Sequence, residues 1–206
     1  MAHAAAATAG RAHERGLDVY TQKVGMWIFL CSEVMFFAGL IGSYIVLRFG
    51  ASDAWGEPGE VLNVPVTAVN TFILICSSVT MVKAFAAAQE GDQKSIKIYT
   101  LATAALGALF LGVQGYEYTE LILHSEWQGS HGFTPQAGLY GATFFTMTGF
   151  HGFHVFLGVV CLSWASIRAF RGHWGPNNYQ GLEVLGLYWH FVDLVWIILF
   201  TIVYLI

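Results

Sequence analysis

Five long apolar runs, each bounded by charged or turn-forming residues, dominate the pattern of hydrophobic and polar positions along the chain. They lie at residues 24–47, 61–82, 98–116, 139–167 and 184–206. A helix needs about 20 mostly apolar residues to cross the hydrocarbon core of a bilayer. Each run has about that length or more. The pattern therefore predicts an all-α membrane protein, a polytopic bundle of five transmembrane helices.

The fourth run belongs to a longer uncharged stretch, residues 127–167, which raises the alternative of two spans. Two spans would need a tight turn inside the stretch, and only residues 134–136 offer turn chemistry. A single helix from about Leu139 is therefore expected. With five spans, eight of the nine basic residues lie on one side of the membrane, and only Arg48 lies on the other. The positive-inside rule then places the N-terminus in the cytoplasm and the C-terminus outside.

Composition agrees with this interpretation. The chain is 56% hydrophobic and 11% charged, whereas a soluble domain carries about 25% charged residues. So few charges could not cover a water-facing surface. The net charge of −4 argues against a nucleic-acid partner. Residues 1–22 are polar and Ala-rich, so we expect a cytoplasmic N-terminal segment there and a membrane domain over residues 23–206.

Five ionisable side chains interrupt the apolar runs at a similar depth. Glu33 and Asp193 lie near the middle of the first and last runs. His151 and His154 share one face of the fourth run by their spacing of three, and His190 comes one turn before Asp193. Ionisable groups inside a membrane are costly and need partners. The sequence therefore predicts a buried acid–histidine network, in which Asp193 pairs with His190 or with another helix.

Two interpretations remain open for these ionisable groups. Glu33 is either a proton-handling group or a neutral carboxylic acid that is hydrogen-bonded between helices. For His151 and His154, packing and interhelical hydrogen bonds are favoured over haem or metal ligation, because a bis-histidine haem needs facing histidines on two helices. Glu117 and Glu120 end the third run, and we expect them to be solvated at the membrane interface.

Small residues four apart, such as Gly39 with Ser43 and Ala38 with Gly42, are typical of close helix contacts in membranes. They predict a tightly packed bundle. The sequence contains no CxxCH haem-attachment motif and no clustered metal-ligand motif. We therefore expect no catalytic residue, haem, copper or other metal in this chain.

Four segments together resemble one family, the cytochrome c oxidase subunit III family of haem-copper oxidases. WIFLCSEVMFFAGLIGSY resembles the helix that carries the family's intramembrane glutamate, YGATFFTMTGFHGFHVFLG its two-histidine helix, and EVLGLYWHFVDLVWIILFTIVYLI its C-terminal helix. LGVQGYEYTELI resembles its acidic helix end, and VNTFILICSSVTM is a weaker match. The match covers residues 22–206 and is to a five-helix form, whereas the longer form has seven helices.

The resemblance implies a non-redox subunit of a proton-pumping terminal oxidase in a bacterial plasma membrane, where partner subunits pass electrons from cytochrome c to oxygen. Haems and coppers then belong to those partners. This chain would pack against catalytic subunit I, beside subunit II and other respiratory-complex subunits, bind phospholipid, and support proton uptake and turnover stability. The resemblance makes Glu33 the family's intramembrane carboxylate. It implies a structural or lipid-contact role for the other matching positions, which are His151, His154, His190, Asp193 and Glu117.

Alternatives remain at this stage. Within the same superfamily these are subunit III of a quinol oxidase and the accessory protein of a nitric oxide reductase; the glutamate in CSEVMFF favours the cytochrome c branch. From other classes come a membrane haem-b anchor and a small proton-coupled channel or transporter built on Glu33 and Asp193. The lack of an internal repeat argues against the transporter.

Overall fold

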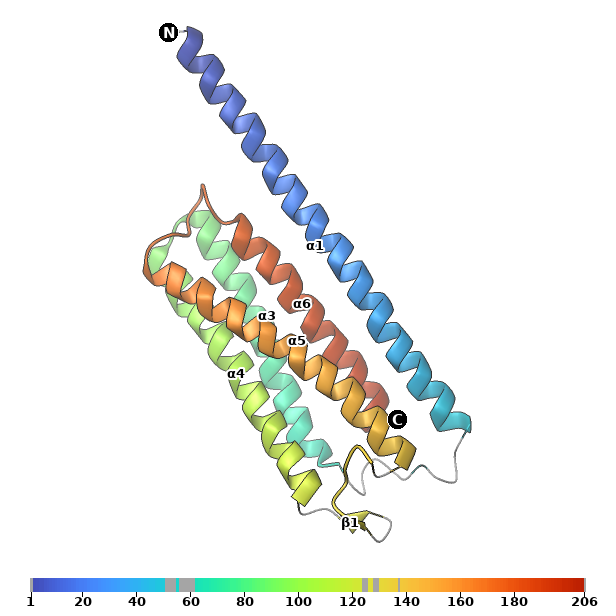
Figure 1. The fold of residues 1–206 in the computed structure, drawn as a ribbon. Coiled ribbons are helices and arrows are strands. Elements are labelled where there is room, and N and C mark those ends of the chain that lie inside the picture. Colours follow the sequence, from blue (N-terminus) through green and yellow to red (C-terminus); the bar gives the residue numbers. More distant parts are fainter. Residues whose placement is uncertain are drawn as a thin grey trace.

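The computed structural model shows a bundle of long helices (Figure 1). It describes residues 2–50, 55, 62–123, 126–127, 130–136 and 138–205. Its helices are α1 (Ala2–Gly50), α3 (Val64–Glu90), α4 (Gln93–Leu123), α5 (Gly138–Phe170) and α6 (Gln180–Phe200), and the π-helical turn η2 (Thr201–Leu205) continues α6. Two two-residue strands, β1 (Glu126–Trp127) and β2 (Ser130–His131), pair antiparallel between α4 and α5.

The predicted fold class is confirmed. Among the described residues, five helices are long and apolar enough to cross a membrane. Each contains most of one of the five apolar runs. Among the described residues of the uncharged stretch before residue 138, Trp127, Ser130 and His131 lie in the two short strands and none is helical, whereas α5 is one uninterrupted helix from Gly138 to Phe170.

The α3–α4 connection is short because both helix ends are capped. Gly91 adopts a left-handed conformation with φ of +82° and donates its N–H to Ala87, which is the usual way to end a helix. Asp92 then accepts hydrogen bonds from the backbone N–H groups of Lys94 and Ser95 and from the Ser95 hydroxyl. The hydrogen bonds from Ser95 hold the pKa of this exposed carboxyl below its ordinary value. α4 therefore begins directly beside the end of α3.

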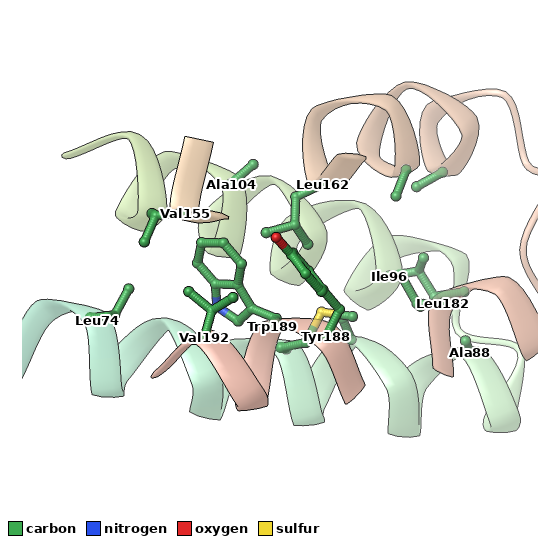
Figure 2. Packing of buried hydrophobic residues seen from close by; sticks show 14 of the residues in the cluster. Leu74, Ala88, Ile96, Ala104, Val155, Leu162, Leu182, Tyr188, Trp189 and Val192 are labelled. Atoms are coloured by element: carbon green, nitrogen blue, oxygen red, sulfur yellow. The ribbon is translucent and has the colours of Figure 1, made fainter. Parts of the chain in front are cut away.

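The centre of the bundle is built around the fully buried Trp189 of α6 (Figure 2). Its indole N–H donates to the Ser77 hydroxyl of α3 at 2.9 Å. Its ring lies against two glycines: a Cβ at Gly107 of α4 would lie 2.6 Å from the indole, and a Cβ at Gly158 of α5 would lie 2.7 Å from it. Because these glycines have no side chain, α4 and α5 can approach the tryptophan ring. The Trp189 side chain of α6 therefore contacts α3, α4 and α5.

Helix α1 is packed far more loosely than the others. Only 11% of its apolar window is buried, against 33–50% for the other spans. It lies along α6 and α5 and runs on past the bundle at its N-terminal end (Figure 1). A Cβ at Gly39 or Gly42 would meet nothing within 4 Å. The small residues of α1, which the sequence predicts to mark packing, therefore make no such contact with the described part of this chain.

The glycine at position 107 provides a test of the packing around Trp189. In Gly107→Ala the added Cβ collides with the buried indole, and overpacking of a core typically costs about 1–3 kcal/mol. We expect the thermal unfolding midpoint of the purified chain in detergent to fall. Gly112→Ala on the same helix is the control, because a Cβ there has open space; its midpoint should be unchanged or higher. Equal midpoints for the two variants would contradict this packing.

Candidate functional site

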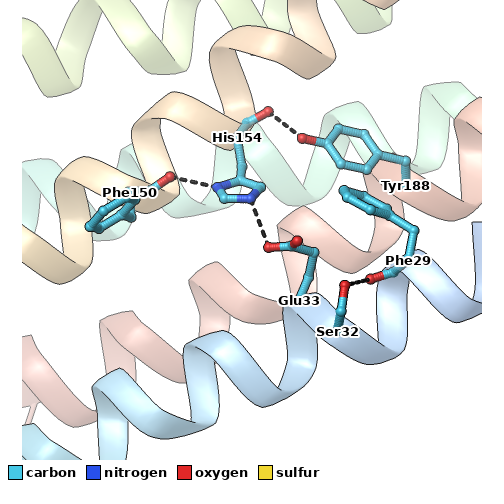
Figure 3. Close-up of polar contacts among 6 residues, drawn as sticks. All are labelled: Phe29, Ser32, Glu33, Phe150, His154 and Tyr188. Carbon is cyan, nitrogen blue, oxygen red and sulfur yellow. Dashed lines mark hydrogen bonds and ion pairs between the residues drawn. The ribbon is translucent and has the colours of Figure 1, made fainter.

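A carboxyl–imidazole pair connects α1 to α5. Glu33 Oε2 and His154 Nε2 lie 3.1 Å apart, and their side chains are 19% and 12% exposed (Figure 3). The other ring nitrogen of His154, Nδ1, lies 2.7 Å from the Phe150 carbonyl oxygen. A carbonyl can only accept, so Nδ1 carries a proton and donates it. The two protein groups that face each other at 3.1 Å therefore share a single proton.

This proton has two possible positions. On Glu33 it makes a neutral carboxylic acid that donates to a neutral imidazole, and on His154 it makes an imidazolium that donates to a carboxylate. Both forms have zero net charge and the same hydrogen bonds. Transfer of the proton across the pair leaves no uncompensated charge in the membrane, where such a charge is costly.

Aromatic side chains surround the pair on both helices. The ring of Phe37 lies edge-on to the His154 ring, with centroids 5.2 Å apart. Phe36 and Phe150 make a similar edge contact between α1 and α5 at 5.1 Å. From α6, the Tyr188 hydroxyl donates to the backbone carbonyl of His154 at 2.9 Å. These contacts hold the imidazole in place and keep one side of the pair apolar.

His151 lies elsewhere, although it is only three residues from His154. It is fully buried, and its Nε2 donates to the Val192 carbonyl of α6 at 3.1 Å. Its ring packs against Trp196, with centroids 4.7 Å apart, and against Phe110 of α4. His151 therefore faces the bundle interior, whereas His154 faces α1.

Asp193 accepts a hydrogen bond from the Ser78 hydroxyl of α3 at 2.8 Å. Its partner thus comes from another helix, one of the two alternatives that the sequence left open. No hydrogen bond or ion pair between His190 and Asp193 is among the contacts of the described residues. The structure brings Glu33 and His154 together but keeps His151 and Asp193 in separate contacts, so the single predicted network is not formed.

Glu117 corrects the expectation of an interfacial, solvated acid. Its side chain is buried at 8% exposure and is hydrogen-bonded to the Thr67 hydroxyl in the first turn of α3. Glu120 is exposed, as expected, and accepts from Tyr116. One turn before Glu117, Gln114 donates to the Thr148 carbonyl of α5 at 3.1 Å. Glu117 is buried because it faces α3, and the sequence alone does not show which helix lies beside it.

The sequence alone does not single out the hydroxyl partners on α3. Besides Thr67, Ser77 and Ser78, α3 contributes Thr71, which accepts from the Trp196 indole N–H at 2.9 Å. Their common signal is a series of Ser and Thr residues in an otherwise apolar helix, which is typical of interhelical hydrogen bonding in membranes. In the part of the chain that the structure describes, no three His, Cys, Asp or Glu side chains gather as a metal site.

Fold and site define a multi-pass helical membrane protein with an acid–histidine pair between two of its spans. The family model for cytochrome c oxidase subunit III matches residues 6–206. The chain therefore belongs to the cytochrome c oxidase subunit III family, whose members are accessory subunits of haem-copper oxidases. The quinol oxidase, nitric oxide reductase and transporter alternatives are not favoured.

Individual relatives are similar in sequence to this chain over most of its length. Cytochrome c oxidase subunit 3 of Corynebacterium diphtheriae is 40% identical over 185 residues, which cover 89% of this chain and 87% of the relative. The protein of the same name from Thermostichus vulcanus is 37% identical over 183 residues, covering 88% and 86%. That of Marchantia polymorpha is 35% identical over 197 residues, covering 88% of this chain and 67% of the relative.

Because Glu33 and His154 are partners, their substitutions should not be additive. Each single change to alanine leaves the other group without its partner, which costs about 1–3 kcal/mol. The double variant should be less destabilised than the sum of the singles, with a coupling of about 0.5–3 kcal/mol. Thermal unfolding of the four proteins in one detergent measures this. A control cycle combines His154→Ala with Ser43→Ala, which lies on the exposed face of α1. The effects of these two changes on stability should be additive. Additivity of Glu33 and His154 would contradict their pairing.

Proposed function

We propose that this chain is the non-redox accessory subunit III of a proton-pumping haem-copper oxidase, in which partner subunits transfer electrons from cytochrome c to oxygen during aerobic respiration. In this proposal the haems and coppers belong to those partners, and this chain contains no catalytic redox centre. The family match and the identity of the relatives as cytochrome c oxidase subunit 3 support the assignment. As a subunit of that complex, the chain takes part in the proton-translocating oxidoreductase reaction of the respiratory electron transport chain.

The observation that carries the proposed role is the Glu33–His154 pair. It lies at a partly exposed position between two spans, and it can hold one proton without net charge. Such a pair can pass its proton between the carboxyl and the imidazole at low electrostatic cost, because neither position of the proton creates a net charge. We therefore assign it a role in proton uptake and in stability during turnover. His151, Asp193 and Glu117 are assigned to positioning the helices that hold it.

The exposed small residues of helix α1 support a contact between this helix and a partner subunit. Ala38, Gly39, Gly42 and Ser43 are all exposed on this helix, and small residues allow the close approach of a neighbouring membrane helix. We assign this face to catalytic subunit I, with subunit II in the same complex and phospholipid filling the remaining apolar surface. The relatives named above from bacteria support a bacterial plasma membrane, and the basic residues support a cytoplasmic N-terminus and an outside C-terminus.

Glu33→Gln in the intact complex tests this function. Glutamine keeps the shape and a hydrogen bond to His154 but cannot carry the exchangeable acid proton. We expect the haem spectrum to stay unchanged, and oxygen consumption to fall by less than about tenfold, a barrier increase below about 1.4 kcal/mol. The enzyme should also inactivate sooner during turnover. Glu120→Gln, an exposed carboxyl on α4, is the matched control and should behave as the wild type.

Two results would argue against the proposal. Complete loss of oxygen reduction in Glu33→Gln would make this carboxyl part of the chemistry and would contradict an accessory role. Wild-type turnover, proton pumping and lifetime would instead support a hydrogen-bonded packing carboxyl with no part in proton handling.

A further inference from the structure

A second buried carboxyl group, Glu117, lies at the end of the bundle where α1, α4 and α6 finish (Figure 1). Its side chain is 8% exposed and belongs to the last two turns of α4. The Glu33–His154 pair joins α1 to α5, whereas Glu117 faces the first turn of α3. The two carboxyl groups therefore belong to separate sites.

The Thr67 hydroxyl is the centre of the contacts around Glu117. It lies 3.1 Å from the Asn63 carbonyl oxygen of its own helix and is hydrogen-bonded to Glu117 Oε1. The Tyr204 hydroxyl, from the π-helical turn η2, is also hydrogen-bonded to it. A threonine hydroxyl has one proton to donate and two lone pairs that accept. All three contacts are hydrogen bonds at once when Thr67 donates to Asn63 and accepts from the other two groups.

This arrangement requires a proton on Glu117. The Asn63 carbonyl can only accept, so it uses the single hydroxyl proton of Thr67. The hydrogen bond between Thr67 and Glu117 must then be donated by the carboxyl. An ionised Glu117 would instead take the hydroxyl proton and leave the contact with Asn63 without one. The neutral acid is therefore the form that satisfies every contact.

The surroundings of Glu117 offer no charge that would favour its ionised form. Among the described residues, it forms no ion pair, and α1, α3 and α5 contribute no titratable group that interacts with it. The titratable groups that do interact with it are Tyr118 of α4 and Tyr204 of η2. Of the nine Lys and Arg residues, only Arg48 lies at this end of the bundle, and it donates to the Tyr44 hydroxyl at 3.3 Å. A carboxylate without a basic partner is costly inside a membrane.

The same contacts connect η2 to the rest of the bundle. Tyr204 is 6% exposed, and it packs in one hydrophobic cluster with Leu121 of α4 and Tyr44 of α1. Because Tyr204 shares the Thr67 hydroxyl with Glu117, it occupies the space that water would need in order to hydrate an ionised carboxyl. Short π-helical segments are frequent at functional sites.

We propose that Glu117, Thr67 and Tyr204 form a second proton-binding site, in which the proton on Glu117 keeps η2 packed against α3 and α4. Loss of this proton leaves a buried carboxylate without a basic partner, admits water and displaces Tyr204. The cluster that also contains Tyr44 then loosens, so the site couples the pH at this end of the bundle to the packing of α1. This inference goes beyond the proposed function and does not depend on it.

The site gives stability a definite pH dependence. A glutamate in water is ionised above about pH 4.3, so at neutral pH the unfolded chain carries Glu117 without its proton, whereas the folded chain carries it with the proton. Unfolding therefore releases a proton, and the folding equilibrium constant decreases by up to about tenfold for each pH unit. The decrease ends at the pH where the folded site also loses its proton, so the contribution of this site is most favourable at low pH.

The experiment measures the thermal unfolding midpoint of the full chain in detergent between about pH 5 and pH 8. In Glu117→Gln the side-chain amide can donate to Thr67 but does not titrate, and its midpoint should fall less over this range than that of the wild type. Glu120→Gln removes an exposed carboxyl one turn further along α4 and should keep the wild-type pH dependence. The same pH dependence in the wild type and in Glu117→Gln would overturn the proposal, as would equal changes in Glu117→Gln and Glu120→Gln.

A second variant changes the site but keeps the carboxyl. Thr67→Val has nearly the same shape but cannot accept from Glu117 or Tyr204. Hydrogen exchange of the η2 amides should become faster by roughly fivefold at a fixed pH, the effect of about one lost hydrogen bond. Thr146→Val is the control, because Thr146 is exposed and its hydroxyl donates to the Ala142 carbonyl of its own helix at 2.6 Å; its η2 amides should exchange as in the wild type. Circular dichroism checks that each variant keeps its helices. Wild-type exchange of η2 in Thr67→Val, or equal acceleration in both variants, would overturn the proposal.

Discussion

These helices are arranged so that polar side chains in the bilayer meet partners within the bundle, because an unpaired polar group is costly there. Each of five helix pairs is joined by at least one such contact: Glu33–His154 for α1 and α5, Thr67–Glu117 for α3 and α4, Ser78–Asp193 for α3 and α6, Gln114–Thr148 for α4 and α5, and His151–Val192 for α5 and α6. A hydrogen bond between membrane helices averages only about 0.6 kcal/mol. Their main effect is therefore to fix rotation and register, because a rotated helix would leave both partners unpaired.

The packing of the hydrophobic core depends on the helix register that these polar contacts fix. Trp189 can enter the centre of the bundle because Gly107 and Gly158 meet its ring from two other helices. Helix α1 contributes Leu30, Phe37 and Tyr44 to the core but is otherwise mostly exposed. Two polar contacts, Glu33 with His154 and Lys23 with Glu183, join it to α5 and α6. The Glu33–His154 pair, which we assign to proton handling, is thus one of the contacts that hold α1 against the other helices. A change in its protonation would act directly on the most loosely packed helix of the chain.

Much of this structure could be predicted from the sequence, because bilayer thickness fixes how long an apolar run must be. The cost of burying polar groups also identified Glu33, His154 and Asp193 as groups that need partners. Their actual partners could not be predicted. Depth gives the position of a residue along the membrane normal but not the neighbouring helix, so Ser78 was missed and Glu117 was expected in solvent. Hydroxyl groups carry little signal because they can bond to their own helix, as Thr67 also does to the Asn63 carbonyl.

We propose that this chain is a redox-inactive subunit that packs beside a haem-copper catalytic subunit. The most direct measurement is purification of the tagged full chain from native membranes, with identification of its partners and a visible spectrum. We expect an equimolar complex with a haem-containing catalytic subunit, and loss of all haem absorbance from the chain once it is separated from that complex. Recovery of the chain without such a partner, or a stoichiometric haem spectrum that stays with the separated chain, would contradict it.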